Sequence, residues 1–234
     1  MKYALLDWDN TLRRGFTLFT WIDYLLDKGY ISPSVRNDIM PFIEMEDSGL
    51  ISHSELAKRA SKIYAEGIRG LTYVEYEKCL VEYMETDESY IFNFVSDLFA
   101  ILSKNNIDAI IISGSPELII RRYAKRFNIS KIYAMLEEKT NGVFNGSVSQ
   151  NFGYNKKRII DKLFKLYGEH PFLSIGDSCA DLAMLEVAKC GFWVKKDNNK
   201  IMDSRFKTLD PNSDQILIEL ESMLTSPSLH AGLQ

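Results

Sequence analysis

The sequence predicts an α/β fold built on a parallel sheet with helices on both faces. Short apolar runs alternate along the chain with stretches of helical periodicity, which is the pattern of strand–helix–strand units. Several of these runs end abruptly at polar residues. In parallel sheets, such positions at the carboxyl ends of the strands form the ligand site.

The composition is that of an ordinary globular chain, with 234 residues, of which 46% are hydrophobic and 26% charged. Collagen-like, low-complexity and disordered classes are therefore excluded. The net charge of −4 favours neither nucleic acid nor an anionic membrane as a partner, and no apolar run approaches the ~20 residues that span a bilayer. The three cysteines are scattered along the chain, which favours a reducing compartment, and we expect a cytoplasmic protein.

The first predicted strand is the apolar run 3–6, which stops at an aspartate. From residue 16 to about residue 84, apolar residues recur at helical spacing, and glycine or proline interrupts the pattern at intervals. Because this stretch contains no convincing strand, we expect a helical domain inserted after the first strand. The predicted boundaries are 15–85 for the insertion, and 1–14 with 86–234 for the α/β core.

Helices and strands alternate after the insertion. We expect helices over 92–102, 116–127, 156–167, 182–189 and 215–224, and strands over 107–112, 132–134, 172–175 and 191–194. Asn-Gly occurs twice within 141–146, which predicts a small hairpin there.

Four carboxylates follow predicted strands, and we expect them to share one crevice. Asp7 and Asp9 follow the first strand, while Asp177 and Asp181 follow the strand at 172–175. Like charges in close proximity destabilise a site unless a cation neutralises them. A hard divalent ion fits these oxygen ligands, and Mg²⁺ also binds phosphate oxygens. For Asp181 alone, a helix cap is an equal alternative.

Asp7 and Asp9 lie two residues apart, so an extended loop would project both side chains to one side. One carboxylate can then attack an electrophile while the other moves a proton. Attack on phosphorus would give an aspartyl phosphate, a recognised covalent intermediate. Thr11 can donate a hydrogen bond to these oxygens, with a turn cap as the equal alternative.

Candidate phosphate-binding groups follow another strand and begin another helix. Ser113 and Gly114 come after the run 107–112, where hydroxyl and backbone N–H groups can hold a phosphoryl oxygen, although a serine before a helix is usually a cap. A lysine at a helix start is better explained by a nearby anion. The apolar positions of helix 156–167 favour Lys156 over Lys157, and a solvated charged face is the alternative to both.

These motifs resemble those of the haloacid dehalogenase (HAD) superfamily. Residues 7–12, DWDNTL, resemble its DxDx[TV] nucleophile motif, and residues 176–181, GDSCAD, resemble its GDxxxD motif. Ser113 and Lys156 match the second and third motifs by order and strand placement. The chain is most similar to the phosphoserine-phosphatase-like branch. The resemblance implies a Rossmann-like core with a helical cap of the C1 type.

The resemblance also implies a Mg²⁺-dependent phosphatase acting on a small phosphorylated metabolite. Asp7 would attack phosphorus, and Asp9 would protonate the leaving oxygen and then activate water. Asp7, the backbone carbonyl of Asp9 and Asp177 would hold the metal ion, with Asp181 in support. Ser113 and Lys156 would bind the phosphoryl oxygens.

Substrate specificity is expected to lie in and near the insertion. Phosphoserine phosphatases carry a glutamate shortly after the nucleophile motif, and Phe16 stands where that acid is expected, which argues against phosphoserine. Arg13, Arg14 and Arg59 are further candidates, each with a solvated surface as the alternative.

Three other functions are weighed against phosphate ester hydrolysis. Dehalogenation does not require a second carboxyl group two residues after the nucleophile. The presence of Asp9 therefore disfavours a dehalogenase. A phosphomutase of the same superfamily and a non-catalytic phospho-ligand-binding module stay open. We expect a monomer or homodimer that binds a small phosphate ester.

Overall fold

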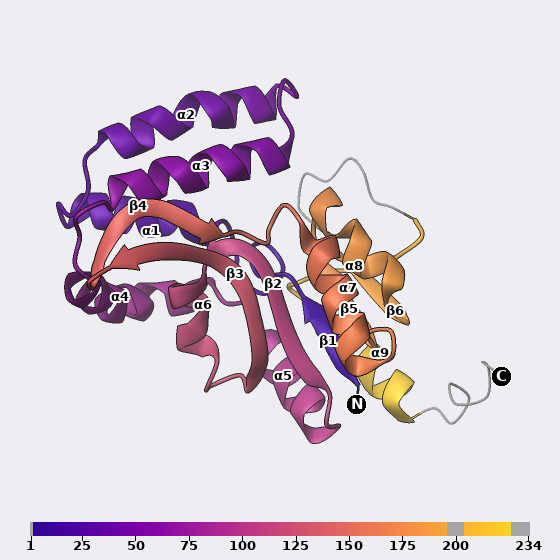
Figure 1. Cartoon of the computed structure of the whole chain (residues 1–234). Coiled ribbons are helices and arrows are strands. Elements are labelled where there is room, and N and C mark those ends of the chain that lie inside the picture. Colours follow the sequence, from indigo (N-terminus) through magenta and orange to yellow (C-terminus); the bar gives the residue numbers. More distant parts are fainter. Residues whose placement is uncertain (1, 196–203, 226–234) are drawn as a thin grey trace.

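The computed structural model describes residues 2–195 and 204–225, so the ends of the predicted core range lie outside the described residues (Figure 1). Its sheet has seven strands in the order β4-β3-β2-β1-β5-β6-β7. The strands are β1 (Tyr3–Leu6), β2 (Asp108–Pro116), β3 (Ile129–Thr140), β4 (Val143–Gln150), β5 (Leu173–Gly176), β6 (Cys190–Val194) and β7 (Lys207–Leu209). The named strands pair in parallel, except that β3 and β4 are antiparallel.

Helices surround this sheet and also form the insertion between β1 and β2. They are α1 (Thr17–Asp27), α2 (Ser34–Asp47), α3 (His53–Gly67), α4 (Tyr73–Asp87), α5 (Val95–Lys104), α6 (Glu117–Tyr123), α7 (Lys156–Tyr167), α8 (Leu182–Val187) and α9 (Gln215–Thr225). Short 3-10 turns span Glu88–Tyr90 and Cys179–Asp181. None of the helices within the described ranges combines the length and apolar character of a membrane span.

The central strand β1 shows why the sheet is covered on both faces. All four of its residues are fully buried, and successive side chains point to opposite faces. Ala4 and Leu6 pack in one cluster with apolar residues of α5 and α9. Tyr3 and Leu5 pack in another cluster with residues of α7. The predicted α/β fold, with a parallel sheet between helical layers, is therefore confirmed.

The insertion has its own core, and the β3–β4 hairpin contributes to it. Phe144 of β4 is buried among aromatic and aliphatic residues of α1, α3 and α4. The tip of the hairpin is hydrogen-bonded to the α3–α4 connection, where Gly70 N donates to Phe144 O (2.9 Å) and Phe144 N donates to Leu71 O (3.0 Å). Figure 1 shows the curved hairpin passing beneath α3. These contacts hold the inserted helices over the carboxyl edge of the sheet.

The hairpin is much longer than the sequence predicts. A short strand at 132–134 and a small turn at 141–146 become two paired strands of 12 and 8 residues. The continuation of β3 is half-buried and rich in charged residues, so its apolar signal is weak. Strand β7 was not predicted because it has only 3 residues.

The buried carboxyl of Glu137 on β3 makes stability depend on pH. It accepts a hydrogen bond from Tyr64 (3.1 Å), and burial raises its pKa from 4.5 to about 7. Between these values the folded protein binds the proton more tightly than the unfolded chain, so stability falls as pH rises through this window. We expect a loss of roughly 1–3 kcal/mol in unfolding free energy between pH 4.5 and 8.

Urea unfolding at several pH values measures this effect. Glu137→Gln removes the titration and should flatten this part of the profile, whereas Glu138→Gln, a more exposed neighbour on β3, should leave it unchanged. Equal slopes for the wild type and Glu137→Gln would contradict the assignment.

Candidate active site

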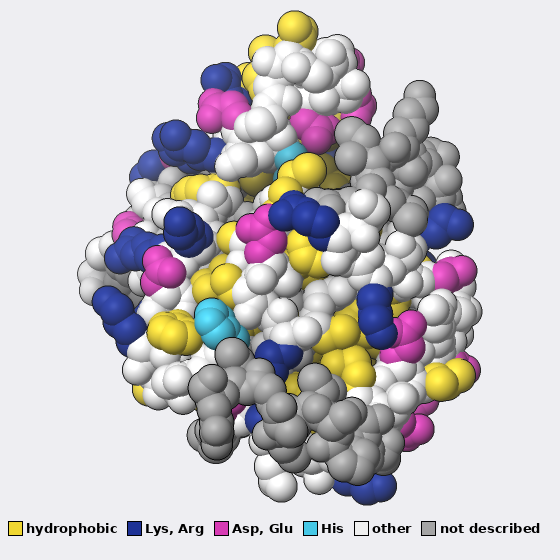
Figure 2. Space-filling view, turned by 90° about the vertical axis from the view of Figure 1, so that its right-hand side faces the viewer, with side chains coloured by type: hydrophobic (Ala, Val, Ile, Leu, Met, Phe, Trp, Pro, Cys, Tyr) yellow, Lys and Arg dark blue, Asp and Glu magenta, His cyan; other side chains and the backbone are white. Residues whose placement is uncertain are grey.

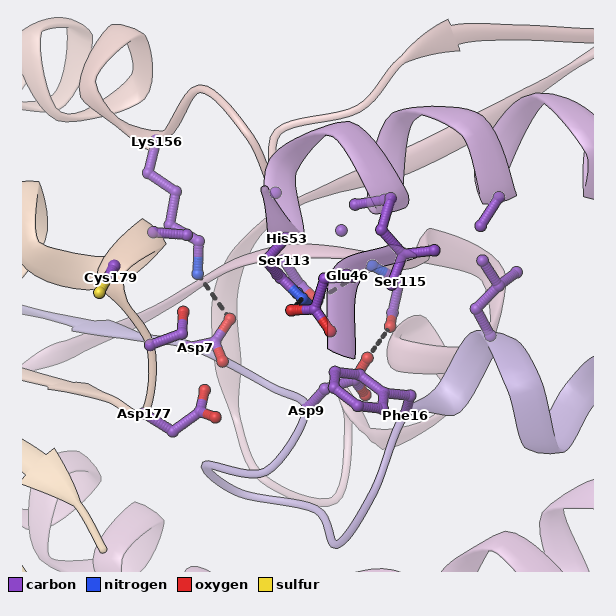
Figure 3. Close-up of a pocket in the computed structure, with 18 of the residues that line it drawn as sticks. Asp7, Asp9, Phe16, Glu46, His53, Ser113, Ser115, Lys156, Asp177 and Cys179 are labelled. Atoms are coloured by element: carbon purple, nitrogen blue, oxygen red, sulfur yellow. Dashed lines mark hydrogen bonds and ion pairs between the residues drawn. The ribbon is translucent and has the colours of Figure 1, made fainter. Parts of the chain in front are cut away.

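The neighbouring strands β2, β1 and β5 bring the polar residues that follow them to one edge of the sheet. Asp7 extends the β1–β5 pairing by one residue, because its backbone N–H donates to Ile175 O (3.0 Å). Ser113 lies near the end of β2, and Asp177 follows β5 directly. Figure 3 shows Asp7, Asp177 and Lys156 facing one another. The structure thus brings together the residues that the sequence places after separate strands.

Three buried carboxylates form the floor of this site. Asp7, Asp177 and Asp181 each offer an oxygen atom, and these atoms lie within 4.8 Å of one another. Thr11 Oγ1 bridges two of them, at 3.1 Å from Asp7 Oδ2 and 3.4 Å from Asp177 Oδ1. Burial raises the pKa of Asp7 well above its ordinary value, and the neighbouring carboxylates add to the rise. Ionised carboxylates so close together require a compensating cation.

Lys156 supplies one positive charge from within the chain. It is the first residue of α7 and is 4% exposed. Its Nζ lies 2.5 Å from Asp7 Oδ1 and 2.5 Å from Asp181 Oδ1. Burial alone lowers the pKa of Lys156, but the two carboxylates outweigh it and raise the pKa above its ordinary value. Lys157 is exposed, so the structure places Lys156 in the site, as the apolar periodicity of the helix indicated.

Asp181 organises the loop after β5. Its Oδ2 accepts hydrogen bonds from the backbone N–H groups of Asp177 (3.1 Å) and Ser178 (2.9 Å), and from the Ser178 hydroxyl (2.8 Å). Its other oxygen accepts from Lys156. A Cβ at Gly176 would lie 2.4 Å from the Asp181 Cβ, so glycine is required for this approach. Both oxygens of Asp181 therefore accept hydrogen bonds. The bonds from the backbone N–H groups are those of a capping residue, which is the alternative role considered for Asp181.

The carboxylate of Asp9 accepts hydrogen bonds from two hydroxyl groups, one in the insertion and one in the α/β core. Its Oδ1 accepts from the hydroxyl (2.5 Å) and backbone N–H (3.0 Å) of Thr17, at the start of α1. Its Oδ2 accepts from Ser115 (2.5 Å), and Trp8 Nε1 donates in turn to Thr17 Oγ1 (3.1 Å). Burial raises the pKa of Asp9, although the bonds from Ser115 and Thr17 oppose the rise. Sequence reasoning missed Thr17 and Ser115, since hydroxyl residues near helix starts are usually caps.

Close glycine contacts shape the opposite wall. Ser113 is buried, and its Oγ accepts from the backbone N–H of Ser115 (3.1 Å). A Cβ on Gly153 would lie 2.5 Å from Gly114 Cα. Glycine is therefore needed at 153 for the loop after β4 to pack against the loop after β2. No local pattern in the sequence indicates this contact, because the two loops are distant along the chain.

A cavity of about 460 Å³ extends from these groups to the inserted helices. The polar residues on its core side include Asp7, Asp9, Ser113, Gly114, Ser115, Lys156, Asp177 and Ser178. The insertion contributes Phe16, Leu18, Phe19, Glu46, His53, Leu56, Ala57 and Ala60. Of the expected specificity residues, Phe16 is the one that lines this cavity.

The structure places Arg13, Arg14 and Arg59, the other expected specificity residues, outside the lining of the cavity. Arg13 is fully buried and paired with Asp87 at 2.6 Å, a contact that joins the two ends of the insertion. The guanidinium of Arg14 lies over the Phe92 ring. Arg59 is paired with a carboxylate one turn away on α3. None of the three arginines lines the cavity.

Comparisons with solved structures found several that share this fold. A protein of unknown function from Bordetella pertussis Tohama I superimposes with a TM-score of 0.74 and 16% identity, over 90% of this chain and 98% of that one. A phosphoserine phosphohydrolase-like protein from Francisella tularensis gives 0.64 and 19%, over 97% and 100%. A phosphoserine phosphatase solved as a phospho-aspartyl intermediate analogue gives 0.60 and 15%, over 82% and 86%. These likenesses show a shared fold.

Comparisons of sequence give the family. A search of curated proteins found no match. Residues 4–186, which include the carboxylates and the lysine of the candidate site, match the haloacid dehalogenase-like hydrolase family. The chain therefore belongs to the haloacid dehalogenase-like hydrolase family.

Proposed function

We propose that the protein is a Mg²⁺-dependent phosphatase that hydrolyses a small phosphate monoester through a phospho-aspartyl intermediate. The observation that carries this proposal is the cluster of three buried carboxylates and one buried lysine at the floor of a single cavity. Two similarities support it, namely membership of the hydrolase family and the shared fold with a phosphoserine phosphatase.

The donor set fits a magnesium ion. Asp7 and Asp177 offer carboxylate oxygens, and the backbone carbonyl of Asp9 would complete the ligands from the chain, with Asp181 in support through the loop contacts described above. Mg²⁺ prefers such all-oxygen surroundings and retains water ligands. When bound, the ion would neutralise the carboxylates and withdraw charge from the phosphoryl oxygens.

The chain's own residues would carry out two displacements at phosphorus. An Asp7 oxygen forms a bond to phosphorus while the bond to the leaving oxygen breaks, and Asp9 gives that oxygen its proton. Asp9 then takes a proton from water, whose oxygen attacks phosphorus and breaks the bond to Asp7. Lys156 and the Ser113–Gly114 segment would bind the phosphoryl oxygens and stabilise the charge that develops on them.

We further propose that residues 15–85 act as a cap over this site, with 1–14 and 86–234 as the core domain. Thr17 of α1 donates a hydrogen bond to Asp9. The position of the insertion and the orientation of Asp9, the proposed proton donor, are therefore linked. On the face shown in Figure 2, the described residues carry charges of both signs, interspersed with one another. A small-molecule substrate suits this surface better than an extended polyanion.

Metal removal tests the proposal. We expect EDTA to abolish the release of p-nitrophenol from p-nitrophenyl phosphate, and added Mg²⁺ to restore it. Asp177→Asn should raise the Mg²⁺ concentration needed for half-maximal activity at least about tenfold. Asp161→Asn, on the exposed face of α7, is the matched control.

The products distinguish the related activities. Inorganic phosphate as the product indicates a hydrolase, whereas an isomeric ester would indicate a phosphomutase. Undiminished turnover in EDTA would contradict the metal requirement, and an inactive protein that binds phosphate esters would indicate a binding module.

A further inference from the structure

The cavity has two chemically different halves. The core side carries the carboxylates, hydroxyl groups and lysine already described, together with Cys179, Ala180 and Trp193, whereas the wall from the insertion is largely apolar. This wall consists of Phe16, Leu18, Phe19, Leu56, Ala57 and Ala60. If the phosphoryl group occupies the polar half, the group attached to the leaving oxygen enters the apolar half.

Phe16 stands where the leaving group must pass. It directly precedes Thr17, whose backbone N–H and hydroxyl are bonded to the carboxylate of Asp9. Phe16 and Asp9 both line the cavity (Figure 3). Because Asp9 is the proposed proton donor to the leaving oxygen, the atoms bonded to that oxygen would enter the part of the cavity that Phe16 lines. Phe16 is also braced by neighbouring rings, with ring-centre distances of 5.8 Å to Phe19 and 5.7 Å to His53.

The two ionisable side chains that the insertion contributes to this wall face each other. Among the described residues that line the cavity, the insertion contributes Glu46 and His53 as its ionisable side chains. His53 Nδ1 lies 3.4 Å from Glu46 Oε1. The His53 ring also lies 5.7 Å from the Phe16 ring. An ammonium or a carboxylate placed against the apolar side chains of this wall would lose water without gaining a partner from them.

We propose that the substrate is a phosphate monoester of an apolar alcohol, with an alkyl or aryl leaving group, and that Phe16 selects it. This inference rests on the proposed phosphatase function. The apolar wall favours a leaving group in proportion to the area that it removes from water. It disfavours leaving groups that carry charges close to the ester oxygen, as in O-phosphoserine.

A series of primary n-alkyl phosphates from ethyl to hexyl tests the proposal, because their leaving groups have nearly equal intrinsic reactivity. We expect kcat/KM to rise roughly fourfold for each added methylene that the apolar wall covers. Butyl phosphate should exceed O-phosphoserine, a primary ester of similar size, by at least about tenfold.

Variants of Phe16 separate selection from catalysis. Phe16→Ser should reduce the butyl-to-ethyl ratio of kcat/KM at least about threefold, and Phe16→Leu should restore most of the ratio. Phe164→Ser makes the same chemical change on the exposed side of α7 and should not alter the ratio. Thermal unfolding of each variant checks that it is folded.

The possible outcomes are distinct. A flat chain-length series, O-phosphoserine hydrolysed as well as butyl phosphate, or an equal effect of Phe16→Ser on both alkyl esters would overturn the inference while leaving the phosphatase function intact. If no ester in the series, including p-nitrophenyl phosphate, releases phosphate with Mg²⁺ present, the proposed function fails and this inference fails with it.

Discussion

Replacement of Asp7 by Asn should lower kcat for phosphate ester hydrolysis by at least about 10³-fold, because the nucleophile would be lost. The substitution preserves the shape of the side chain but removes the anionic oxygen that would attack phosphorus. Asp7 also contributes to the cluster of carboxylates, so the affinity for Mg²⁺ should fall as well. Steady-state assays at saturating Mg²⁺ separate the loss of the nucleophile from the loss of metal affinity.

Two controls make the Asp7 result specific. Asp161→Asn removes an exposed carboxylate and should retain full activity. Circular dichroism should show the same helix content for Asp7→Asn as for the wild type. Retention of more than about a tenth of the activity by a folded Asp7→Asn protein would exclude Asp7 as the nucleophile.

Lys156→Met should affect both activity and stability, because the Lys156 ammonium lies between two buried carboxylates. Without it, Asp7 and Asp181 lose their shared partner at 2.5 Å. We expect kcat/KM to fall at least about 10²-fold. In metal-free buffer, the unfolding free energy should fall by about 3 kcal/mol, and saturating Mg²⁺ should restore part of it.

Lys157→Met is the matched control for this prediction. It removes an adjacent but exposed lysine, so both measurements should stay close to the wild type. Urea unfolding followed by tryptophan fluorescence gives the stabilities. If Lys157→Met had the larger effect on activity, the assignment of the phosphate-binding lysine would be reversed.

The features that could be predicted from sequence are those with a strong local pattern. The run 3–6 is apolar without interruption because β1 is buried on both faces, and helix α7 spans the predicted range because its apolar periodicity is regular. The acidic motifs follow β1 and β5, which are neighbours in the sheet. The strand ends of a parallel sheet therefore sufficed to predict that Asp7 and Asp177 lie at the same edge, and the structure adds that their strands are neighbours.

The features that could not be predicted depend on contacts between distant segments. Arg13 pairs with Asp87, 74 residues away, and nothing near Arg13 in the sequence distinguishes a buried cation from a solvated one. Thr17 and Ser115 both reach Asp9, but each reads locally as a cap. The length of the hairpin could not be predicted because its strands pack against the inserted helices. That contact joins segments that are distant in the sequence.

Peptide mapping of acid-quenched enzyme tests the central claim, phosphoryl transfer to the chain, most directly. The enzyme is mixed with a phosphate monoester and Mg²⁺, quenched within a turnover and digested at low pH for mass spectrometry. The account predicts an added phosphoryl group on Asp7, absent when Mg²⁺ is withheld and absent in Asp7→Asn. A phosphoryl group on another residue, or its absence from the chain during active turnover, would contradict it.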